Sequence, residues 1–518
     1  MRKLMVIALV SLLLLAVAPT GRTDTAAPAV VRVHATSDAE AAYLMSAFDE
    51  THNHSAGEIE LLLWPGDRAE LDALGLDYEV VTENLFADDL AAHSGPKPLV
   101  ELPGPDRTDY RRLPDYNAEL QKLAKKNKGL VKLFEMPNPS LEGRTIYGVE
   151  IAANVDEQDG RPIFYLDGVH HAREWPASEF TLLYAYHLVE NYGKDRAITK
   201  LLKKTRVIVV PIVNVDGFDY SRESLAQNSL LGAGNGFEGY WRKNRRSFTG
   251  VTAPGIQKNP DAYGVDPNRN YAYLWGDQNG GSSNFFFDQT YRGAAPWSEP
   301  EVVNVRDIIL DRPVTAVLTN HTYQATVLRA GGGKAPDDRV LEAVGARMAQ
   351  ALDFRNVPTV GYPTTGTTDD WSYAATGSLG FTIEHGSQGF HPPYATGVGD
   401  PTDKTMEAFQ ILHAAAADPR YHAIIKGHVP GDATLTLKKT FKTPLSEGNP
   451  IGEEFVTEKL SYELAVNGKF TWHVPSSNRP YEKKAESYTL VISSGGKTKT
   501  LEVNVDWGDV HNLGHVKF

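Results

Sequence analysis

Apolar runs separated by helical patterns constrain the fold of this chain more than any other feature. Each run is rich in aliphatic or β-branched residues and has the length of one buried strand. The runs occupy residues 144–151, 161–166, 206–213, 315–320 and 379–383. Nearly continuous apolar strands that alternate with helices are typical of a parallel sheet covered on both faces. We therefore predict an α/β domain over residues 110–421, with helices on both faces of a mixed, mostly parallel sheet.

A smaller α/β pattern precedes this domain. We predict a helix over residues 38–50 with Ser37 as its N-cap, and three strands at residues 30–34, 58–64 and 78–81. Residues 87–109 then form a polar linker with four prolines. An exposed linker after a small domain is a preferred site of proteolytic cleavage. We therefore expect residues 24–86 to be a pro-segment that an activating protease releases, and a permanent N-terminal domain is the alternative.

The pattern changes to strands alone over residues 422–518. Asn467-Gly468 lies between two alternating segments and is a strong signal for a hairpin turn. A second hairpin is expected around the glycines at 495 and 496. We predict a small C-terminal β-sandwich, in which Trp472 and Trp507 are either core residues or a binding platform.

The first residues have the pattern of a secretory signal. Met1-Arg2-Lys3 is basic, residues 4–18 are apolar, and small and polar residues follow. The apolar stretch is short for a membrane span, which needs about 20 residues. We expect residues 1–23 to be a signal peptide and the mature protein to be secreted, with no membrane segment. An N-terminal membrane anchor is the alternative.

Composition excludes several kinds of chemistry. The chain has no cysteine, so it can use neither a disulfide nor a thiolate, whether as metal ligand or as nucleophile. Its formal net charge of −13 disfavours nucleic acids and anionic membranes as partners.

The segment His171-Ala172-Arg173-Glu174-Trp175 carries the main chemical signal. It follows a predicted strand, and at a strand end His171 and Glu174 can both turn toward one metal ion. Catalytic zinc takes three protein ligands, so another ligand must come from elsewhere in the chain. His321 also follows a predicted strand, and open α/β sheets bind ligands beyond the carboxyl ends of their strands. We interpret neighbouring His170 as structural, because adjacent side chains on an extended segment point in opposite directions.

Further motifs follow this segment in the order found in the metallocarboxypeptidases related to carboxypeptidases A and B. They are Asn214-Val215-Asp216-Gly217-Phe218, Trp241-Arg242-Lys243, Asp266-Pro267-Asn268-Arg269-Asn270, Asn320-His321-Thr322-Tyr323, the Tyr362 loop that ends in Asp370-Trp371-Ser372-Tyr373, and Phe381-Thr382-Ile383-Glu384. The chain therefore resembles this zinc carboxypeptidase family over residues 110–399. The resemblance implies the zinc carboxypeptidase fold and a secreted, bacterial-type member.

The resemblance also implies a catalytic centre with one zinc ion per chain. His321 would complete a ligand set with His171 and Glu174. Glu384 resembles the glutamate that takes a proton from zinc-activated water and passes it to the leaving amine. Arg242 matches the arginine that stabilises the oxyanion.

Other matched residues imply a binding site for the end of a peptide. Asn268 and Arg269 match the pair that holds the substrate's terminal carboxylate, which a guanidinium can bind through two hydrogen bonds. Tyr362 matches a mobile tyrosine that closes over the bound end. Arg173 and Tyr323 would contact substrate as well, Arg173 further upstream.

Asp369 bears on side-chain preference. It falls where enzymes that cut after lysine or arginine carry an aspartate at the pocket floor, and a buried carboxylate there would favour a basic side chain. Arg329 could oppose this preference from the pocket rim. We expect a slight preference for basic C-terminal residues.

The function that these inferences favour is a secreted, monomeric zinc carboxypeptidase, made as a precursor, that removes C-terminal residues from peptides and proteins. A peptidase of cell-wall peptides with the same zinc chemistry is one alternative. A non-catalytic binding protein on the same fold is another.

Overall fold

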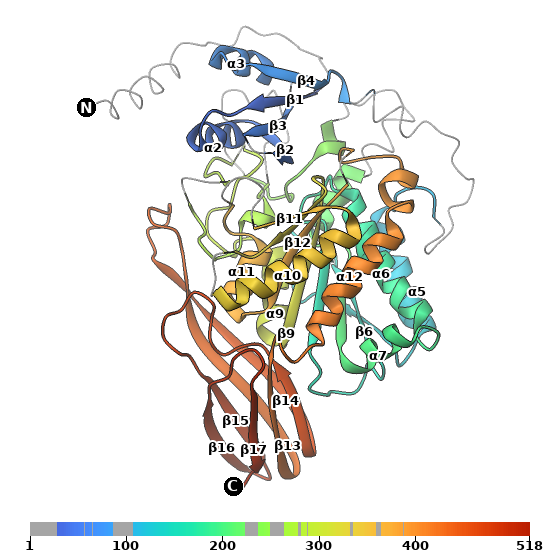
Figure 1. The fold of residues 1–518 in the computed structure, drawn as a ribbon, viewed down its shortest axis with the longest axis vertical. Coiled ribbons are helices and arrows are strands. Elements are labelled where there is room, and N and C mark those ends of the chain that lie inside the picture. The colour runs from blue at the N-terminus through green and yellow to red at the C-terminus, as the bar shows by residue number, and fades with distance from the viewer. Residues whose placement is uncertain are drawn as a thin grey trace.

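An eight-stranded sheet forms the centre of the molecule (Figure 1). The computed structural model describes residues 28–55, 57–64, 66–85, 87, 107–222, 237–248, 264–277, 281–286, 288–331, 335–358, 364–386 and 388–518. The sheet has the strand order β11-β10-β12-β9-β7-β8-β6-β5. Its strands are β5 Val131–Glu135, β6 Tyr147–Ile151, β7 Ile163–Gly168, β8 Arg206–Val210, β9 Val314–Thr322, β10 Thr326–Arg329, β11 Arg355–Val357 and β12 Leu379–His385.

The middle of this sheet is parallel and its margins are mixed. Neighbours are parallel from β12 through β9 and β7 to β8, and β10 is parallel to β11. The pairs β10–β12, β6–β8 and β5–β6 are antiparallel. The predicted mixed, mostly parallel sheet is thus confirmed, and each of the apolar runs forms a strand. The sequence did not predict β5, β10 and β11, because they are short and two of them are partly exposed edge strands without a continuous apolar run.

Helices flank the sheet on both sides. The helices are α5 Leu113–Lys126, α6 Trp175–Asn191, α7 Arg196–Lys204, α9 Pro300–Asp311, α10 Ala335–Leu352, α11 Thr368–Thr376 and α12 Thr402–Ala416, with short turns η1 Phe237–Tyr240, η3 Pro267–Arg269 and η4 Ala395–Gly399. Helix α12 packs between α6 and α10, whereas α11 packs on β9 and β12. Figure 1 shows α9 and α11 on the other side of the sheet from α6 and α12.

The N-terminal unit is a separate four-stranded sheet with the order β2-β3-β1-β4. Its elements are β1 Ala29–His34, α2 Asp38–Ala47, β2 Asp49–Ser55, β3 Glu58–Leu63, α3 Asp67–Leu74 and β4 Tyr78–Thr82. Ser37 caps α2 as predicted, since its hydroxyl accepts from the Glu40 N–H at 3.2 Å. Helix α2 ends before residue 50, because Asp49 and Glu50 pair with β3 as the start of β2.

The C-terminal β-domain, residues 422–518, consists of β13 Ala423–Pro444, β14 Phe455–Val474, β15 Tyr488–Ser494, β16 Lys497–Val503 and β17 Val510–His515. We expected a sandwich of two sheets, but the hydrogen bonds join all five strands into one sheet. The reason is the length of β13, which pairs first with β17 and then with β15, with an irregularity between His428 and Asp432. Asn467-Gly468 lies opposite this irregularity inside β14, so the first predicted hairpin is wrong. The β15–β16 hairpin is confirmed.

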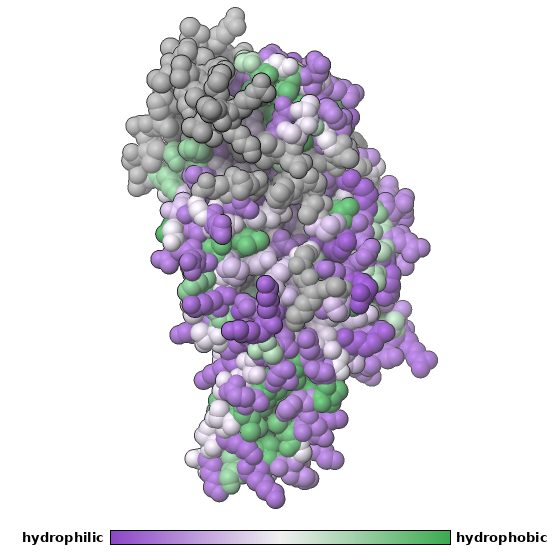
Figure 2. Space-filling model, turned by 60° about the vertical axis from the view of Figure 1, so that its left-hand side comes forward, coloured by the Kyte–Doolittle hydropathy of each residue, from purple (hydrophilic) through white to green (hydrophobic). Residues whose placement is uncertain are grey.

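One cluster of buried hydrophobic side chains extends from Tyr110 to Val516 and thus includes both the α/β domain and the C-terminal β-domain. Trp472 is 1% exposed and belongs to this core. Figure 2 shows a mostly hydrophilic surface, with hydrophobic side chains gathered over the lower part of the molecule, where the C-terminal β-domain lies. Among the described helices, none is long and apolar enough to span a membrane.

Candidate active site

Three buried side chains meet at the carboxyl edge of the sheet. His171 and Glu174 follow β7, and His321 lies near the end of the neighbouring strand β9. Glu174 Oε1 lies 2.7 Å from His171 Nδ1, and Glu174 Oε2 lies 2.9 Å from His321 Nδ1. The ligand atoms of the three residues are all within 4.8 Å of one another. Two imidazoles and one carboxylate are a donor set that suits catalytic zinc, so these residues fit the metal that the sequence predicts.

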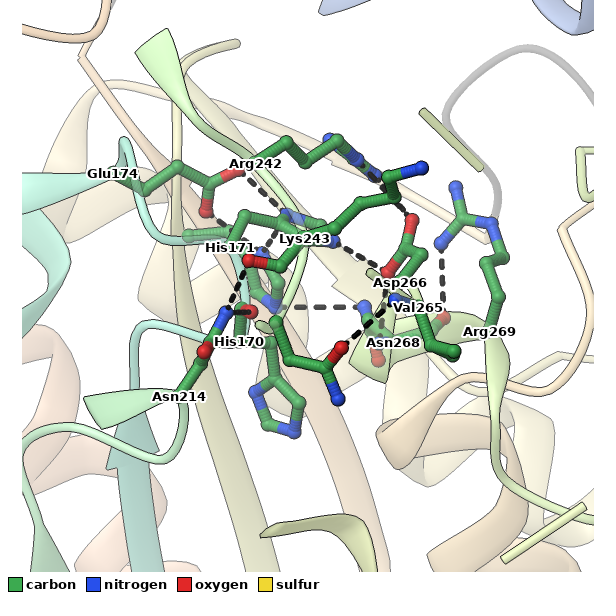
Figure 3. A network of polar contacts seen from close by, with 12 residues as sticks. His170, His171, Glu174, Asn214, Arg242, Lys243, Val265, Asp266, Asn268 and Arg269 are labelled. Carbon is green, nitrogen blue, oxygen red and sulfur yellow. Dashed lines mark hydrogen bonds and ion pairs between the residues drawn. The ribbon is translucent and has the colours of Figure 1, made fainter. Parts of the chain in front are cut away.

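The Asp266 carboxylate holds two of the predicted functional side chains (Figure 3). Its Oδ1 lies 3.1 Å from His171 Nε2, on the side of the ring away from the cluster. Its Oδ2 accepts from Arg242 Nε and Nη2 at 3.1 and 2.9 Å. An outer carboxylate of this kind fixes the tautomer and orientation of a ligating histidine. Asp266 belongs to the motif Asp266-Pro267-Asn268-Arg269-Asn270, but no local feature of the sequence predicts that it supports His171 and Arg242.

Ion pairs keep the Glu174 and Asp266 carboxylates charged, although both are buried. Although burial disfavours its charged form, the imidazoles of His171 and His321 hold the pKa of Glu174 well below its usual range. Burial also opposes the charge on Asp266, yet Arg242 and His171 hold the pKa of that carboxyl well below its usual range. Both carboxylates are therefore charged at neutral pH, which for the predicted ligand Glu174 is the state that metal binding requires.

Glu384 lies beside the metal ligands because of strand register. It is in β12, which runs parallel to β9, and its Cα pairs with that of His321. Neighbouring strands are about 4.8 Å apart. The Glu384 side chain is buried, with the residue 2% exposed. The structure thus brings the predicted general base next to the third predicted ligand.

Asn268 and Arg269 lie in η3, directly after Asp266. The Asn268 Nδ2 atom is 3.4 Å from His321 Nε2, which places the amide beside the metal cluster. The Arg269 guanidinium donates to the backbone carbonyls of Gly281 and, at 2.9 Å, Asn268. The structure therefore brings this predicted pair together, with Asn268 next to the predicted metal ligand His321.

Thr368 holds the Asn268 side chain, a role that the sequence did not predict. Its backbone N–H and its hydroxyl both donate to Asn268 Oδ1, at 3.0 and 2.9 Å. The same hydroxyl lies 3.0 Å from His170 Nε2, and Tyr271 OH lies 2.8 Å from that nitrogen. His170 is completely buried and is not part of the metal cluster, as expected for a structural histidine. No local signal marks Thr368, because its partners lie about a hundred or more positions earlier in the chain.

Arg173 and Tyr323 contact the N-terminal unit. Arg173 Nη1 and Nη2 donate to the Asp49 carboxylate at 2.6 and 2.8 Å, and Nη2 also donates to the Glu50 carbonyl. Tyr323 OH donates to Glu60 Oε1 at 2.9 Å. Arg173 and Tyr323, both predicted to contact substrate, thus form hydrogen bonds with residues of β2 and β3.

Asp369 and Arg329 are the residues predicted to influence side-chain preference. Asp369 lies in the first turn of α11 and is 8% exposed. Next to it, burial and the Asp369 charge raise the pKa of Asp370 well above its usual range. Arg329 Nη1 donates to Asn356 Oδ1 at 3.4 Å. Tyr362 lies outside the described residues.

The fold and the buried group of His171, Glu174 and His321 define a protein with a candidate metal site, and comparison with known proteins identifies its family. The family model described as zinc carboxypeptidase matches residues 116–403, which is more than half of the chain. The chain belongs to the zinc carboxypeptidase family.

Relatives from animals agree with this assignment. Mouse carboxypeptidase A2 is 31% identical over 294 residues, which are 54% of this chain and 64% of the relative. Human carboxypeptidase B is 27% identical over 298 residues, which are 55% of this chain and 65% of the relative. The chain therefore spans less than two thirds of these relatives' length.

Solved structures show the same fold. The carboxypeptidase A of Helicoverpa armigera superposes with a TM-score of 0.61 at 22% identity, over 76% of this chain and 98% of that one. Thrombin activatable fibrinolysis inhibitor superposes with a TM-score of 0.59 at 20% identity, over 76% of this chain and 99% of that one. At these identities the similarity establishes the fold alone.

Proposed function

We propose that this protein is a zinc-dependent carboxypeptidase that removes the last residue of peptides and proteins. The observation that carries this proposal is the position of Glu384, which is in register with His321 and so lies beside the cluster of His171, Glu174 and His321. A base next to a metal cluster supports hydrolysis, and the neighbouring Asn268-Arg269 pair supports selection of a free C-terminus.

Glu384 and Arg242 have different roles in the proposed hydrolysis of the peptide bond. When bound, zinc supplies a Lewis acid that polarises the peptide carbonyl and makes water more acidic. Glu384 takes a proton from the attacking water and later gives it to the departing amine. Arg242, oriented by Asp266, stabilises the negative charge that develops on the carbonyl oxygen.

Substrate selection rests on the Arg269 guanidinium. In this structure it donates to the Gly281 and Asn268 carbonyls, and a substrate carboxylate would compete for the same donors. Charge-assisted, two-pronged hydrogen bonds to a carboxylate are stronger than bonds to neutral carbonyls. Binding of a free C-terminus would therefore shift Arg269 from the protein backbone to the substrate.

Contacts between the pro-segment and the α/β domain support the proposal that the protein is made as an inactive precursor. Asp49 and Glu60 occupy Arg173 and Tyr323, the residues proposed to contact substrate. Val30 and Leu62 of the pro-segment also form a buried cluster with Tyr240, Tyr323 and Phe390 of the α/β domain, and Trp64 packs against it. Occupation of a substrate-binding surface by the pro-segment would keep the precursor inactive until the linker at residues 87–109 is cut.

The proposal also includes a slight preference for basic C-terminal residues and secretion of the protein. Asp369 is buried in α11 near the Asn268–Thr368 contact, which supports a slight preference for basic C-terminal residues. The sequence pattern of residues 1–23 supports secretion.

The test uses protein cut in the linker and peptides that end in Lys, Arg, Leu, Phe or Glu, each with a free or an amidated C-terminus. Loss of a single residue from free ends only, abolished by a zinc chelator, is the expected result. Wild-type protein that retains zinc but trims none of these peptides would overturn the proposal. Cell-wall peptides would then be assayed next.

A further inference from the structure

The C-terminal β-domain contacts the middle of helix α11. Trp371, at the centre of this helix, is completely buried, and its Nε1–H donates to the Glu458 carboxylate at 3.3 and 3.2 Å. Glu458 belongs to β14 and also accepts a short hydrogen bond from the Thr443 hydroxyl of β13. A buried indole N–H needs an acceptor, and this acceptor comes from the C-terminal β-domain.

The same domain also holds the end of α11. Gly377 is the C-cap of the helix, and its carbonyl accepts from Trp507 Nε1 at 2.9 Å. Trp507 lies between β16 and β17, so it comes from a different part of the domain than Glu458. The C-terminal end and the middle of α11 are thus both held by residues beyond 422.

The beginning of α11 contacts Asn268 of the proposed carboxylate site. Thr368, its first residue, donates twice to Asn268 Oδ1, and Asp369 follows it. A helix of nine residues transmits a displacement with little bending, because its turns are joined by hydrogen bonds. The position of α11 therefore sets the position of the Asn268 amide and of the Asp369 carboxylate.

A second set of contacts reaches the segment that follows Asn268 and Arg269. Leu274 N–H donates to the Pro444 carbonyl at 2.9 Å, and the Ser446 hydroxyl donates to the Leu274 carbonyl at 2.8 Å. Tyr273 stacks on Tyr481, with ring centroids 4.8 Å apart. The C-terminal β-domain thus contacts both chain segments that form the proposed carboxylate site.

We propose that the C-terminal β-domain positions the site for the substrate's last residue, with Glu458 and Trp507 as positioning residues that act through α11. This inference rests on the proposed carboxypeptidase function. The family model ends at residue 403, so the domain lies outside the matched segment. The predicted zinc ligands are held from within the α/β domain, by Asp266 and by one another. Loss of the α11 contacts is therefore expected to weaken substrate binding while zinc stays bound.

The test compares four variants of the full chain after cleavage of the linker. They are Glu458→Ala, Glu458→Gln, Trp507→Phe and, as control, Glu463→Ala. Glu463 lies on the same strand but is exposed, so its loss is expected to leave every readout unchanged. Readouts are KM and kcat on a peptide with a free C-terminus, and zinc content per chain. Because single-chain variants are compared, no isolated domain has to fold.

Glu458→Ala is expected to raise KM about tenfold, since it leaves the buried Trp371 N–H without its acceptor. Trp507→Phe, which removes the donor to the Gly377 carbonyl and part of the ring at a half-buried position, is expected to raise KM about threefold. Glu458→Gln keeps an oxygen acceptor and is expected to restore the wild-type KM. In all four variants one zinc is bound and kcat changes little.

Two outcomes in the variants would overturn the inference while leaving the proposed function intact. Unchanged KM in both Glu458→Ala and Trp507→Phe would show that α11 does not need the C-terminal β-domain. A fall in zinc content or kcat at constant KM would show a general structural role instead. If Glu458→Ala does not fold, Trp507→Phe decides. Wild-type protein that binds zinc but trims no peptide would reject the proposed function, and this inference with it.

Discussion

The guanidinium of Arg173 and the carboxylate of Asp49 form a two-pronged ion pair at 2.6 and 2.8 Å, although 124 positions separate them in the chain. Both side chains are almost completely buried. The pair joins the N-terminal unit to the segment that carries two of the predicted zinc ligands, so its removal tests whether the N-terminal unit is an inhibitory pro-segment.

We expect Asp49→Ala to activate the uncut precursor. Removal of one partner from a buried ion pair costs about 3–5 kcal/mol, because the other charge stays buried without compensation. The pro-segment would then detach more readily from Arg173. Peptide hydrolysis by uncut protein is the measurement, and Asp77→Ala, an exposed change in the same unit, is the control. An Asp49→Ala precursor as inactive as the wild type would contradict this role of the pair.

We expect Asp266→Asn to weaken zinc binding. The variant keeps the size of the side chain but removes the charge that orients His171 and Arg242. Loss of such an outer partner lowers metal affinity about 10- to 100-fold. Competition with a fluorescent chelator measures the affinity, with Asp403→Asn on the exposed side of α12 as a matched control. Equal affinity in both variants would show that Asp266 does not support the metal site.

We expect Asp369→Asn to reduce selectivity for basic C-terminal residues. A desolvated charge-assisted pair contributes about 1.5–3 kcal/mol, so the ratio of kcat/KM for Lys over Leu would fall about tenfold or more. Paired peptides that differ only in the last residue give this ratio. If the wild type already prefers Leu, or the ratio does not change, Asp369 does not read the substrate.

We expect Glu301→Gln to change how stability depends on pH. Burial, together with the charges of Glu299 and Asp216, raises the pKa of Glu301 to about 8. The folded state thus binds this proton more tightly than the unfolded state does. Its contribution to stability is complete below the unfolded pKa and is lost as pH rises toward 8, by at most about 1.4 kcal/mol per pH unit.

Urea unfolding at pH 5, 6.5 and 8 provides the measurement for Glu301. The wild type is expected to lose free energy of unfolding with rising pH relative to Glu301→Gln, which cannot ionise. Parallel pH dependence in the two proteins would mean that Glu301 does not titrate with a raised pKa.

The sequence determined the α/β core, the metal cluster and the family. Buried parallel strands are nearly continuous apolar runs, so residues 161–166 and 379–383 could be recognised by composition alone. His171 and Glu174 are close in sequence, and the motifs found in the order of the zinc carboxypeptidases implied His321 as the third ligand. The strand predictions succeeded because they rest on a regular apolar pattern, and the predictions of the metal cluster and the family succeeded because they rest on several short motifs of neighbouring residues.

Only the tertiary structure decided which distant residues meet. The Asn467-Gly468 pair predicts a turn locally, but the pairing of β13 with β14 on both sides of it keeps β14 continuous. The contacts Asp49–Arg173 and Glu458–Trp371 join residues 124 and 87 positions apart. No local pattern selects such partners, because their energies depend on burial and on charges that only packing brings together. The contacts of the N-terminal unit with Arg173 and Tyr323, and the contacts of the C-terminal β-domain with α11, are consequences of that packing.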